Sequence, residues 1–398
     1  DEKSPIKEPG LQELVSDKIK NNYLSLSKNV KSIADSDVII ITVGTPLSDK
    51  HDADLSYLKN ACNEIEPVLK NNSLVLIKST VTPGITRNLI YPILSRNKAI
   101  SLAFTPERFA EGNAIEELKN LPIVVGGVNS KSTEEACQFW KKALGVNIIK
   151  VSSCETAELV KLANNAWIDV NIALANDLAR VSDLFGGQID ILEVIEAANS
   201  LKKGSSTVNL LRPSSGVGGY CLTKDPLFLY EMGKKNGIEL KTVIAGRETN
   251  DFMPTYSCDK IVEALKKEHK NLEKIKILVM GLSFKTNSGD IRSTPVHPFL
   301  QKLQEYGFSN ICAFDPLICD DDYITLGVKK ASNIREELRK ADCVAVMNGH
   351  DLMDQVSKEE LIKYCGGGTI IFDGRKYYPR EALKDFKSHN LHYIGIGR

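Results

Sequence analysis

The chain has 398 residues, 42% of them hydrophobic and 26% charged, and its 51 lysines and arginines equal its 51 aspartates and glutamates. This composition is typical of globular proteins and excludes disordered and collagen-like chains, while the lack of a basic excess argues against nucleic acid as a partner. No apolar run reaches the ~18 residues of a membrane span, and the polar start lacks the apolar core of a signal peptide. At about 100–200 residues per domain, the length predicts two or three domains.

The nine cysteines are scattered along the chain and form no C-x-x-C pair. An odd, scattered set predicts a reduced, cytoplasmic protein with neither a disulfide framework nor a zinc site. One cysteine could still serve as a nucleophile.

The first third of the chain alternates strand-length apolar runs with helical periodicity. Residues 38–43 form a continuous run rich in β-branched side chains, which predicts a strand buried on both faces, as in a parallel sheet. The same reasoning predicts further strands at 73–80, 100–104 and 122–126 and helices at 55–69 and 132–144. Repeated strand–helix alternation predicts a doubly wound α/β sheet.

From residue 154 onward the pattern becomes helical. Residues 155–185 form one apolar-periodic stretch without proline or glycine, which predicts a helix far longer than the ~11–12-residue mean. Residues 189–198 continue as helix, and no strand pattern returns until after residue 270. Alternation then resumes, with strands expected at 276–281, 311–315, 341–347 and 368–373 and a helix at 295–306. We therefore expect two Rossmann-like α/β domains joined by a helical middle, divided as 1–150, 151–268 and 269–398.

The first domain lacks a G-x-G-x-x-G sequence, the motif that normally opens a dinucleotide-binding domain. The chain starts in a loop-like segment, residues 4–10, that leads directly into a helix. Either about one βαβ unit of ~30 residues is missing upstream, or this domain does not bind a dinucleotide. The motifs that follow favour the first alternative.

The sharpest motif is a glycine-rich loop at 215–221 that ends in Cys221 and is followed by Lys224 and Asp225. Three glycines in four positions permit close approach of the backbone to a ligand, and a nearby lysine can lower the pKa of a thiol. The alternative is a structural turn with a buried cysteine. A helix starting at Asp225 and Pro226 fits either interpretation.

A second motif places Glu158, Lys161 and Asn165 on one face of the long helix. They form either a solvated stripe with an ion pair, or a lysine and an amide aimed into a cleft, where they could stabilise an oxyanion.

Two further groups of residues follow predicted strands. Residues 44–46, 79–80 and 105–111 follow strands of the first sheet, at the edge where open α/β sheets bind ligands. Lys285, Arg292 and Arg375 follow strands of the second sheet, where they either hold phosphates or form surface charge. Because the G-x-G-x-x-G spacing is not met there, this domain favours a nucleotide other than NAD. The six histidines lie near none of these motifs, so we expect them at the surface or capping helices.

In this order, the motifs resemble the UDP-glucose/GDP-mannose dehydrogenase family along nearly the whole chain, from residue 4 to residue 398. The resemblance implies an N-terminal NAD-binding domain, a helical middle that forms a homodimer, and a C-terminal domain that binds a nucleotide sugar. It also implies that the missing opening carries the G-x-G-x-x-G motif.

In this family one active site oxidises the C6 alcohol of the sugar twice, to a carboxylate, with two NAD⁺. Cys221 matches the catalytic cysteine, whose thiolate attacks the C6 aldehyde to give a thiohemiacetal. A second hydride transfer then gives a thioester, which water hydrolyses. Lys161 and Asn165 match the pair that stabilises the oxyanion. Asp225 matches the carboxylate that assists proton transfer. Thr80 and Glu107 match the residues that place the hydrolytic water, with Glu107 as the candidate general base.

The resemblance also assigns binding residues and no metal ligands. The matches to NAD contacts are Gly44, Thr45, Pro46, Thr80, Lys224 and Arg292. The matches to nucleotide-sugar contacts are Glu107, Arg108, Glu111, Lys161, Asn165, Gly218, Gly219, Phe284, Lys285 and Arg375. In the family's dimer the arginine at position 375 reaches the partner's site.

Some residues depart from the family pattern. Thr223 stands where many members have proline, which affects the stiffness of the loop and not its chemistry. Arg108 and residues 169–176 favour the branch that acts on UDP-N-acetylhexosamines, whereas Tyr220 replaces a histidine common in that branch. We expect UDP-N-acetyl-D-mannosamine as substrate, with UDP-glucose and UDP-N-acetylglucosamine as alternatives. A non-catalytic nucleotide-sugar binder is the second hypothesis, and a single-step hydroxyacid dehydrogenase, which has no need of a Gly-Gly-x-Cys loop, is a third.

Overall fold

The computed structural model describes residues 4, 6, 8–49, 51–204, 206–268 and 274–398. The chain forms two compact units, one made of Asp1–Ala166 and Lys224–Leu240, the other of Trp167–Thr223 and Lys241–Arg398. Three predictions fall on residues outside the described ranges. They concern the domain boundary at 268/269, the side chain of His269, and parts of the opening segment.

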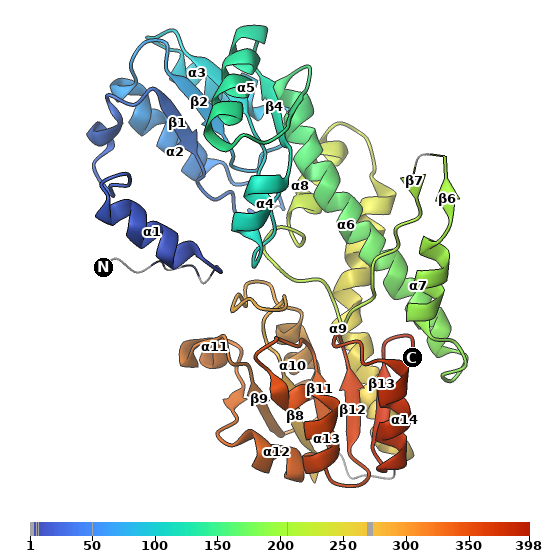
Figure 1. The fold of residues 1–398 in the computed structure, drawn as a ribbon. Coiled ribbons are helices and arrows are strands. Elements are labelled where there is room, and N and C mark those ends of the chain that lie inside the picture. Colours follow the sequence, from blue (N-terminus) through green and yellow to red (C-terminus); the bar gives the residue numbers. More distant parts are fainter. Residues whose placement is uncertain (1–3, 5, 7, 50, 205, 269–273) are drawn as a thin grey trace. The chain divides into compact units, whose positions relative to one another are not determined.

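The first unit is built on a five-stranded sheet in the order β1-β2-β3-β4-β5 (Figure 1). Its strands are β1 (Val38–Ile41), β2 (Leu74–Ile77), β3 (Ser101–Phe104), β4 (Ile123–Gly127) and β5 (Ile148–Lys150). Only the β3–β4 pair is antiparallel, and β5 is absent from the prediction. The prediction that residues 38–43 are buried on both faces is wrong. β1 is an edge strand of this sheet, and Ile40 is 39% exposed while Ile39 and Ile41 face the core.

Helices cover both faces of this sheet. Alternate residues of β2 point to opposite sides, as strand geometry requires. Val75 and Ile77 pack with α2, α3 and the start of α6, whereas Leu74 and Leu76 pack with α5. The helical elements of this unit are α1 (Leu11–Lys20), η1 (Val30–Ile33), α2 (Ser56–Ile65), η2 (Glu66–Val68), η3 (Thr86–Ile90), α3 (Tyr91–Leu94), α4 (Ala114–Asn120), α5 (Ser130–Leu144), the first part of α6 (Cys154–Asp183) and α8 (Asp225–Lys235).

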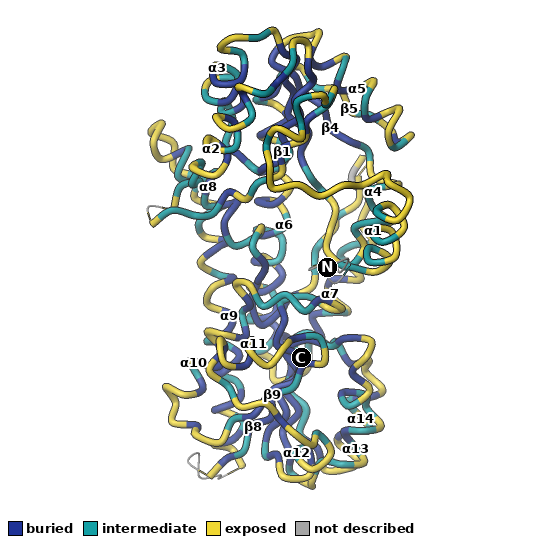
Figure 2. Tube along the Cα trace, turned by 90° about the vertical axis from the view of Figure 1, so that its left-hand side faces the viewer, coloured by how far each residue is buried: buried dark blue, intermediate teal, exposed yellow. Residues whose placement is uncertain are grey.

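The second unit is built on a fully parallel six-stranded sheet in the order β10-β9-β8-β11-β12-β13. Its strands are β8 (Lys276–Met280), β9 (Asn310–Phe314), β10 (Lys329–Lys330), β11 (Cys343–Val346), β12 (Ile370–Asp373) and β13 (His392–Gly395). The central strands are buried on both faces (Figure 2). The order reverses next to β8, which is the arrangement of a doubly wound Rossmann-like sheet.

Helices of the second unit bury the two faces of its sheet. Ile277 and Val279 of β8 pack with α9 and α10, and Leu278 and Met280 pack with α12, α13 and α14. The helical elements are the second part of α6, α7 (Ile191–Asn199), α9 (Lys241–Lys267), α10 (Val296–Glu305), α11 (Asp320–Thr325), α12 (Ile334–Lys340), η5 (Asp354–Val356), α13 (Lys358–Tyr364) and α14 (Arg380–Ser388). The single long helix predicted at 155–185 is therefore confirmed as α6.

The middle of the chain is not wholly helical as predicted. A short antiparallel hairpin of β6 (Lys202–Lys203) and β7 (Ser206–Thr207) follows α7. Two-residue strands are too short to leave an apolar alternation in the sequence, which explains why the pattern did not reveal them. Within the described part of the chain, no helix combines the length and apolar character that crossing a membrane requires.

Candidate functional site

The predicted strand ends of the first unit do meet at one edge. β1, β2 and β3 are parallel neighbours, so the segments that contain Gly44, Thr80 and Glu107 all leave the sheet at its carboxyl edge. A Cβ atom added at Gly44 would meet nothing within 4 Å, so a ligand can approach this backbone. The hydroxyl of Thr105 is buried at the same edge and has no hydrogen-bond partner among the described residues. Open backbone beside an unpaired hydroxyl fits a polar ligand lying across this edge.

Glu107 is held by an ion pair and by backbone donors. Its Oε2 lies 2.8 Å from Nζ of Lys78, and its Oε1 accepts the N–H groups of Arg108 (2.7 Å) and Phe109 (3.1 Å). These three contacts fix the position of the carboxylate. Glu107 borders a cavity of about 20 Å³, room for about one water. The Arg108 guanidinium lines it as well and donates to the Pro122 carbonyl.

The polar face of α6 is not a solvated stripe. Glu158 is fully buried, and its carboxylate accepts the N–H groups of Gly84 (2.6 Å) and Thr86 (2.8 Å). Burial raises the pKa of Glu158 above its ordinary value, although these hydrogen bonds oppose the shift. Asn165 is also buried, whereas Lys161 is half-buried and makes no ion pair with any described residue. The interpretation of this face as part of a functional cleft therefore gains support.

Asn165, Lys224 and Asp225 form a buried polar cluster in the first unit. The Asn165 amide donates to Oδ2 of Asp225 over 2.6 Å, and the Lys224 ammonium lies 2.6 Å from Oδ1. Asp225 is 0% and Lys224 5% exposed, and the ammonium also lies 4.5 Å from the centre of the Phe228 ring. α8 starts at Asp225 with Pro226 in its first turn, as predicted.

In the second unit, the glycine loop packs directly on Phe284. A Cβ atom at Gly218 would lie 2.6 Å from Cβ of Phe284, and one at Gly219, where φ is +90°, would lie 2.6 Å from its ring. The carbonyl of Phe284 in turn accepts Nη1 of Arg375 over 2.6 Å. The structure therefore brings together four of the predicted substrate residues. The loop glycines permit a close approach, as predicted, and the group that approaches them is Phe284.

Cys221 follows this loop and is exposed, as is Cys319. Most other described cysteines are buried, and burial raises the pKa of their thiols, to about 12 for Cys62, Cys154 and Cys312. A thiol with so high a pKa is a poor nucleophile at neutral pH. Exposure therefore separates Cys221 from these buried cysteines.

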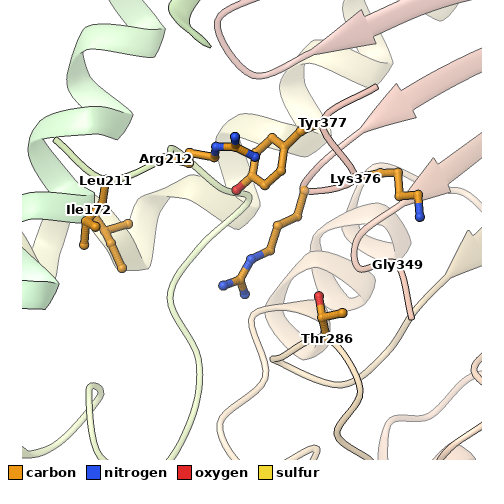
Figure 3. A pocket seen from close by; sticks show the side chains of 8 residues that line it. Ile172, Leu211, Arg212, Thr286, Gly349, Lys376 and Tyr377 are labelled. Carbon is orange, nitrogen blue, oxygen red and sulfur yellow. The ribbon is translucent and has the colours of Figure 1, made fainter. Parts of the chain in front are cut away.

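A cavity of about 420 Å³ in the second unit is lined mostly by residues that the sequence analysis did not predict as ligand contacts (Figure 3). Its lining is Ile172, Leu211, Arg212, Thr286, Gly349, Arg375, Lys376 and Tyr377. Two guanidinium groups and an ammonium favour an anionic ligand. Arg212 lies beside Tyr377, with its guanidinium carbon 5.1 Å from the ring centre. Only Arg375 was predicted, because no motif marks the extended stretch that carries Arg212.

Other predicted residues lie near this loop or at the surface. The exposed Arg292 pairs with Asp290 over 2.5 Å, and its guanidinium carbon lies 5.6 Å from the centre of the Tyr220 ring. Lys285 is half-buried next to Phe284, and Glu111 of the first unit is exposed.

The prediction for the histidines is wrong for His350. This side chain is 1% exposed, and its Nδ1 accepts the N–H of Asn287 over 2.8 Å. The hydrogen-bond pattern therefore assigns the proton to Nε2, which lies 3.0 Å from Oδ2 of Asp315 and 3.2 Å from Oγ of Ser283. His350 thus holds the segment that contains Phe284. Sequence spacing hid this role because His350 and Ser283 are 67 residues apart.

Asp315 is the acidic partner of this histidine. Burial alone would raise its pKa, but hydrogen bonds from His350 and from the N–H groups of Leu317 and Leu282 bring the pKa of Asp315 below its ordinary value. Among the described residues, no group of three His, Cys, Asp or Glu side chains is arranged to hold a metal ion.

The comparisons with known proteins match three parts of the chain. The NAD binding domain of the UDP-glucose/GDP-mannose dehydrogenase family matches residues 1–144, the family's central domain matches 155–252, and its UDP binding domain matches 278–380. A UDP-N-acetyl-D-mannosamine dehydrogenase of Methanococcus maripaludis is 35% identical over 385 residues, 95% of this chain and 84% of that protein.

Solved structures similar to this chain are also nucleotide-sugar dehydrogenases. A UDP-D-ManNAc dehydrogenase from Pyrococcus horikoshii has a TM-score of 0.86 at 28% identity and covers 99% of this chain and 89% of its own. A UDP-glucose dehydrogenase from Pyrobaculum islandicum also has a TM-score of 0.86, at 25% identity, over 100% of this chain and 88% of its own.

The buried pair of Lys224 and Asp225 yields a stability prediction. Lys224→Met leaves a buried carboxylate without its cation, so we expect a loss of about 3–5 kcal/mol in the free energy of unfolding of the first unit. The control is Lys235→Met at the other end of α8, which removes the surface pair with Asp52 and should cost about 0–1 kcal/mol. Urea unfolding curves measure both, and equal losses in the two variants would contradict this account of the cluster.

Proposed function

Because this chain belongs to the UDP-glucose/GDP-mannose dehydrogenase family, and is an NAD-dependent oxidoreductase, we propose that it oxidises the C6 alcohol of a UDP-sugar to a carboxylate. The proposed substrate is UDP-N-acetyl-D-mannosamine, the sugar nucleotide that the names of several relatives give. UDP-glucose and UDP-N-acetylglucosamine are the alternatives. UDP-glucose is kept because the similar structure from Pyrobaculum islandicum is named a UDP-glucose dehydrogenase.

One chain of contacts in the second unit carries the proposal. The anionic-ligand cavity includes Arg375, Arg375 donates to the carbonyl of Phe284, and Phe284 packs on Gly218 and Gly219. The exposed Cys221 follows two residues later. A diphosphate held by Arg212, Arg375 and Lys376 would therefore be anchored to the same loop that carries a nucleophilic thiol.

NAD supplies the hydride acceptor in both oxidations. The residues proposed to hold it are Gly44, Thr45, Pro46, Thr80, Lys224 and Arg292. The open backbone at Gly44 and the unpaired hydroxyl of Thr105 support a polar ligand at this edge of the first sheet.

The protein's own residues carry the remaining steps. After the first hydride transfer converts the alcohol to an aldehyde, the thiolate of Cys221 adds to the aldehyde carbon and forms a thiohemiacetal. Loss of a second hydride gives a thioester, and water breaks the carbon–sulfur bond to release the carboxylate and the thiol. Lys161 and the Asn165 amide stabilise the developing oxyanion. Asp225, which already contacts Asn165 over 2.6 Å, assists proton transfer through water.

The hydrolytic water is assigned to Thr80 and Glu107. Lys78 and two backbone N–H groups hold the Glu107 carboxylate in place, and Glu107 is the candidate general base for this water. The sugar contacts proposed in addition are Arg108, Glu111, Gly218, Gly219, Phe284, Lys285 and Arg375, together with the cavity residues Arg212 and Lys376.

Three features of the whole chain complete the proposal. The domains are 1–150 for NAD, 151–268 for dimerisation and 269–398 for the UDP-sugar.

The helix α6 presents Trp167, Leu174 and Val181, seven residues apart and each about half exposed, with Leu184 82% exposed beyond them. An exposed apolar stripe of this kind supports a homodimer. The scattered cysteine pattern supports the cytoplasm as its compartment.

The substrate assignment predicts a stoichiometry. We expect the complete protein, incubated with NAD⁺, to form two NADH for each UDP-N-acetyl-D-mannosamine consumed, since four electrons leave the sugar. Absorbance of NADH, with chromatography of the products, measures this against UDP-glucose and UDP-N-acetylglucosamine. Preference for another UDP-sugar would correct the substrate, whereas no NADH with any of them would favour a non-catalytic nucleotide-sugar binder.

The nucleophile assignment predicts the effect of one substitution. Cys221→Ala should abolish formation of the uronate, because no thioester can form without the thiol. Cys319→Ala is the matched control, since it removes the other exposed cysteine of the second unit and should leave uronate formation unchanged. Unchanged uronate production by Cys221→Ala would overturn the assignment.

A further inference from the structure

The nucleophile segment, residues 209–223, contains no regular helix or strand and is held by side chains of α6 and α9 within the second unit. At its start, Asn171 of α6 donates to the carbonyl of Asn209 over 2.7 Å and accepts the N–H of Leu211 over 2.8 Å. Further along, Asn176 accepts the N–H of Ser214 over 2.8 Å. Because irregular backbone lacks the regular hydrogen bonds of helices and strands, these side-chain amides supply partners for its polar groups and fix the path of the segment.

The end of the nucleophile segment is held by a buried arginine. Nη1 of Arg247 in α9 donates to the carbonyl of Leu222, the residue after Cys221, over 3.1 Å. The same nitrogen lies 2.6 Å from Oδ1 of Asp169 in α6, and the other guanidinium nitrogens bind Asp251. Arg247 is 3% and Asp169 0% exposed. The donor to the Leu222 carbonyl is therefore a cation that its partners hold in place.

A continuous line of hydrogen bonds joins the two ends. The Asn250 amide donates to the carbonyl and to Oδ1 of Asp169, each over 2.8 Å, and accepts the Asn176 amide over 2.9 Å. Within the segment, the N–H and the hydroxyl of Thr223 both contact the carbonyl of Gly219, at 3.4 Å and 2.9 Å. A proline at position 223 could make neither contact, so this chain closes its loop with hydrogen bonds.

The buried ion pair is poorly explained by stability alone. Burial raises the pKa of Asp169 despite the opposing charge of Arg247, and its Oδ2 has no hydrogen-bond partner among the described residues. Taking both charges out of water is costly, and packed apolar residues often stabilise a protein as well or better. What apolar residues cannot supply is a fixed donor to the Leu222 carbonyl.

We propose that Arg247 and Asp169 are positioning residues, which fix the Leu222 carbonyl and through it the placement of Cys221 for attack on the sugar aldehyde. This inference rests on the proposed function for its catalytic consequence. A displacement of about 1 Å in a reacting group can cost on the order of 100-fold in rate. Binding of the UDP-sugar depends instead on the cavity and on the start of the segment, which Asn171 and Asn176 hold.

The test compares two ion pairs that join the same two helices, the buried pair of Arg247 with Asp169 and the partly buried pair of Lys260 with Asp183. Lys260 of α9 lies 2.5 Å from Asp183 of α6, and neither residue contacts the nucleophile segment in the described structure. Arg247→Met and Lys260→Met therefore each remove one cation from the α6–α9 contact, but only the first frees the Leu222 carbonyl. We expect Arg247→Met to lower kcat about 100-fold with little change in KM for the UDP-sugar, and Lys260→Met to leave kcat within about twofold of the wild type. Arg247→Lys keeps the positive charge but lacks the several N–H donors of the guanidinium group, so its kcat should lie between those of Arg247→Met and the wild type.

Amide hydrogen exchange of peptides from 215–223 gives a second readout that needs no turnover. Exchange should accelerate in Arg247→Met and stay at the wild-type rate in Lys260→Met. If no UDP-sugar yields NADH, the proposed function fails, while faster exchange in Arg247→Met alone would still support the positioning role. Equal losses of kcat in the two methionine variants, or unchanged exchange in Arg247→Met, would overturn it. If Arg247→Met does not fold, Arg247→Lys and Asp169→Asn serve in its place, with the same exchange criterion.

Discussion

Buried charges must be paired, and this requirement governs the surroundings of the loop that carries Cys221. Lys224 and Asp225 form a buried pair in the first unit, and Arg247 and Asp169 form one in the second. The helix α6 contributes to both, since Asn165 binds Asp225 and Asp169 binds Arg247. Each contact is internal to its own unit, yet both secure backbone that adjoins the same cysteine. Besides connecting the domains, α6 therefore supplies polar side chains, Asn165 and Asp169, to both buried pairs.

The chain has no net charge, and only a few cations are proposed to hold its anionic ligand. Arg212, Arg375 and Lys376 gather around one cavity, and Arg375 also braces Phe284 against the glycine loop. In the proposed mechanism, phosphate recognition and placement of the nucleophile thus share Arg375. Exposure distinguishes Cys221 from cysteines such as Cys62 and Cys154, because burial raises the pKa of those thiols to about 12.

The sequence predicted what depends on local periodicity and on short motifs. The strands β2, β3, β8 and β12 and the long helix α6 were found because apolar residues repeat at the spacing of each element. The glycine loop and the residues beyond the strand ends were found because they are contiguous in the chain. The exposed face of β1 was missed because the covering of a strand's face depends on elements that are distant in the chain, which local sequence does not record. His350 and Arg212 were missed for a similar reason, since each meets its partners through distant parts of the chain.

The central claim is that Cys221 carries the sugar as a thioester between the second oxidation and hydrolysis. Acid quenching of the complete protein during turnover with NAD⁺ and UDP-N-acetyl-D-mannosamine, followed by peptide mass spectrometry, tests it most directly. The account predicts a covalent adduct with the mass of the acylated sugar nucleotide on the peptide that contains Cys221. Uronate formation with the adduct on another residue, or with none on Cys221 at any time point, would contradict it.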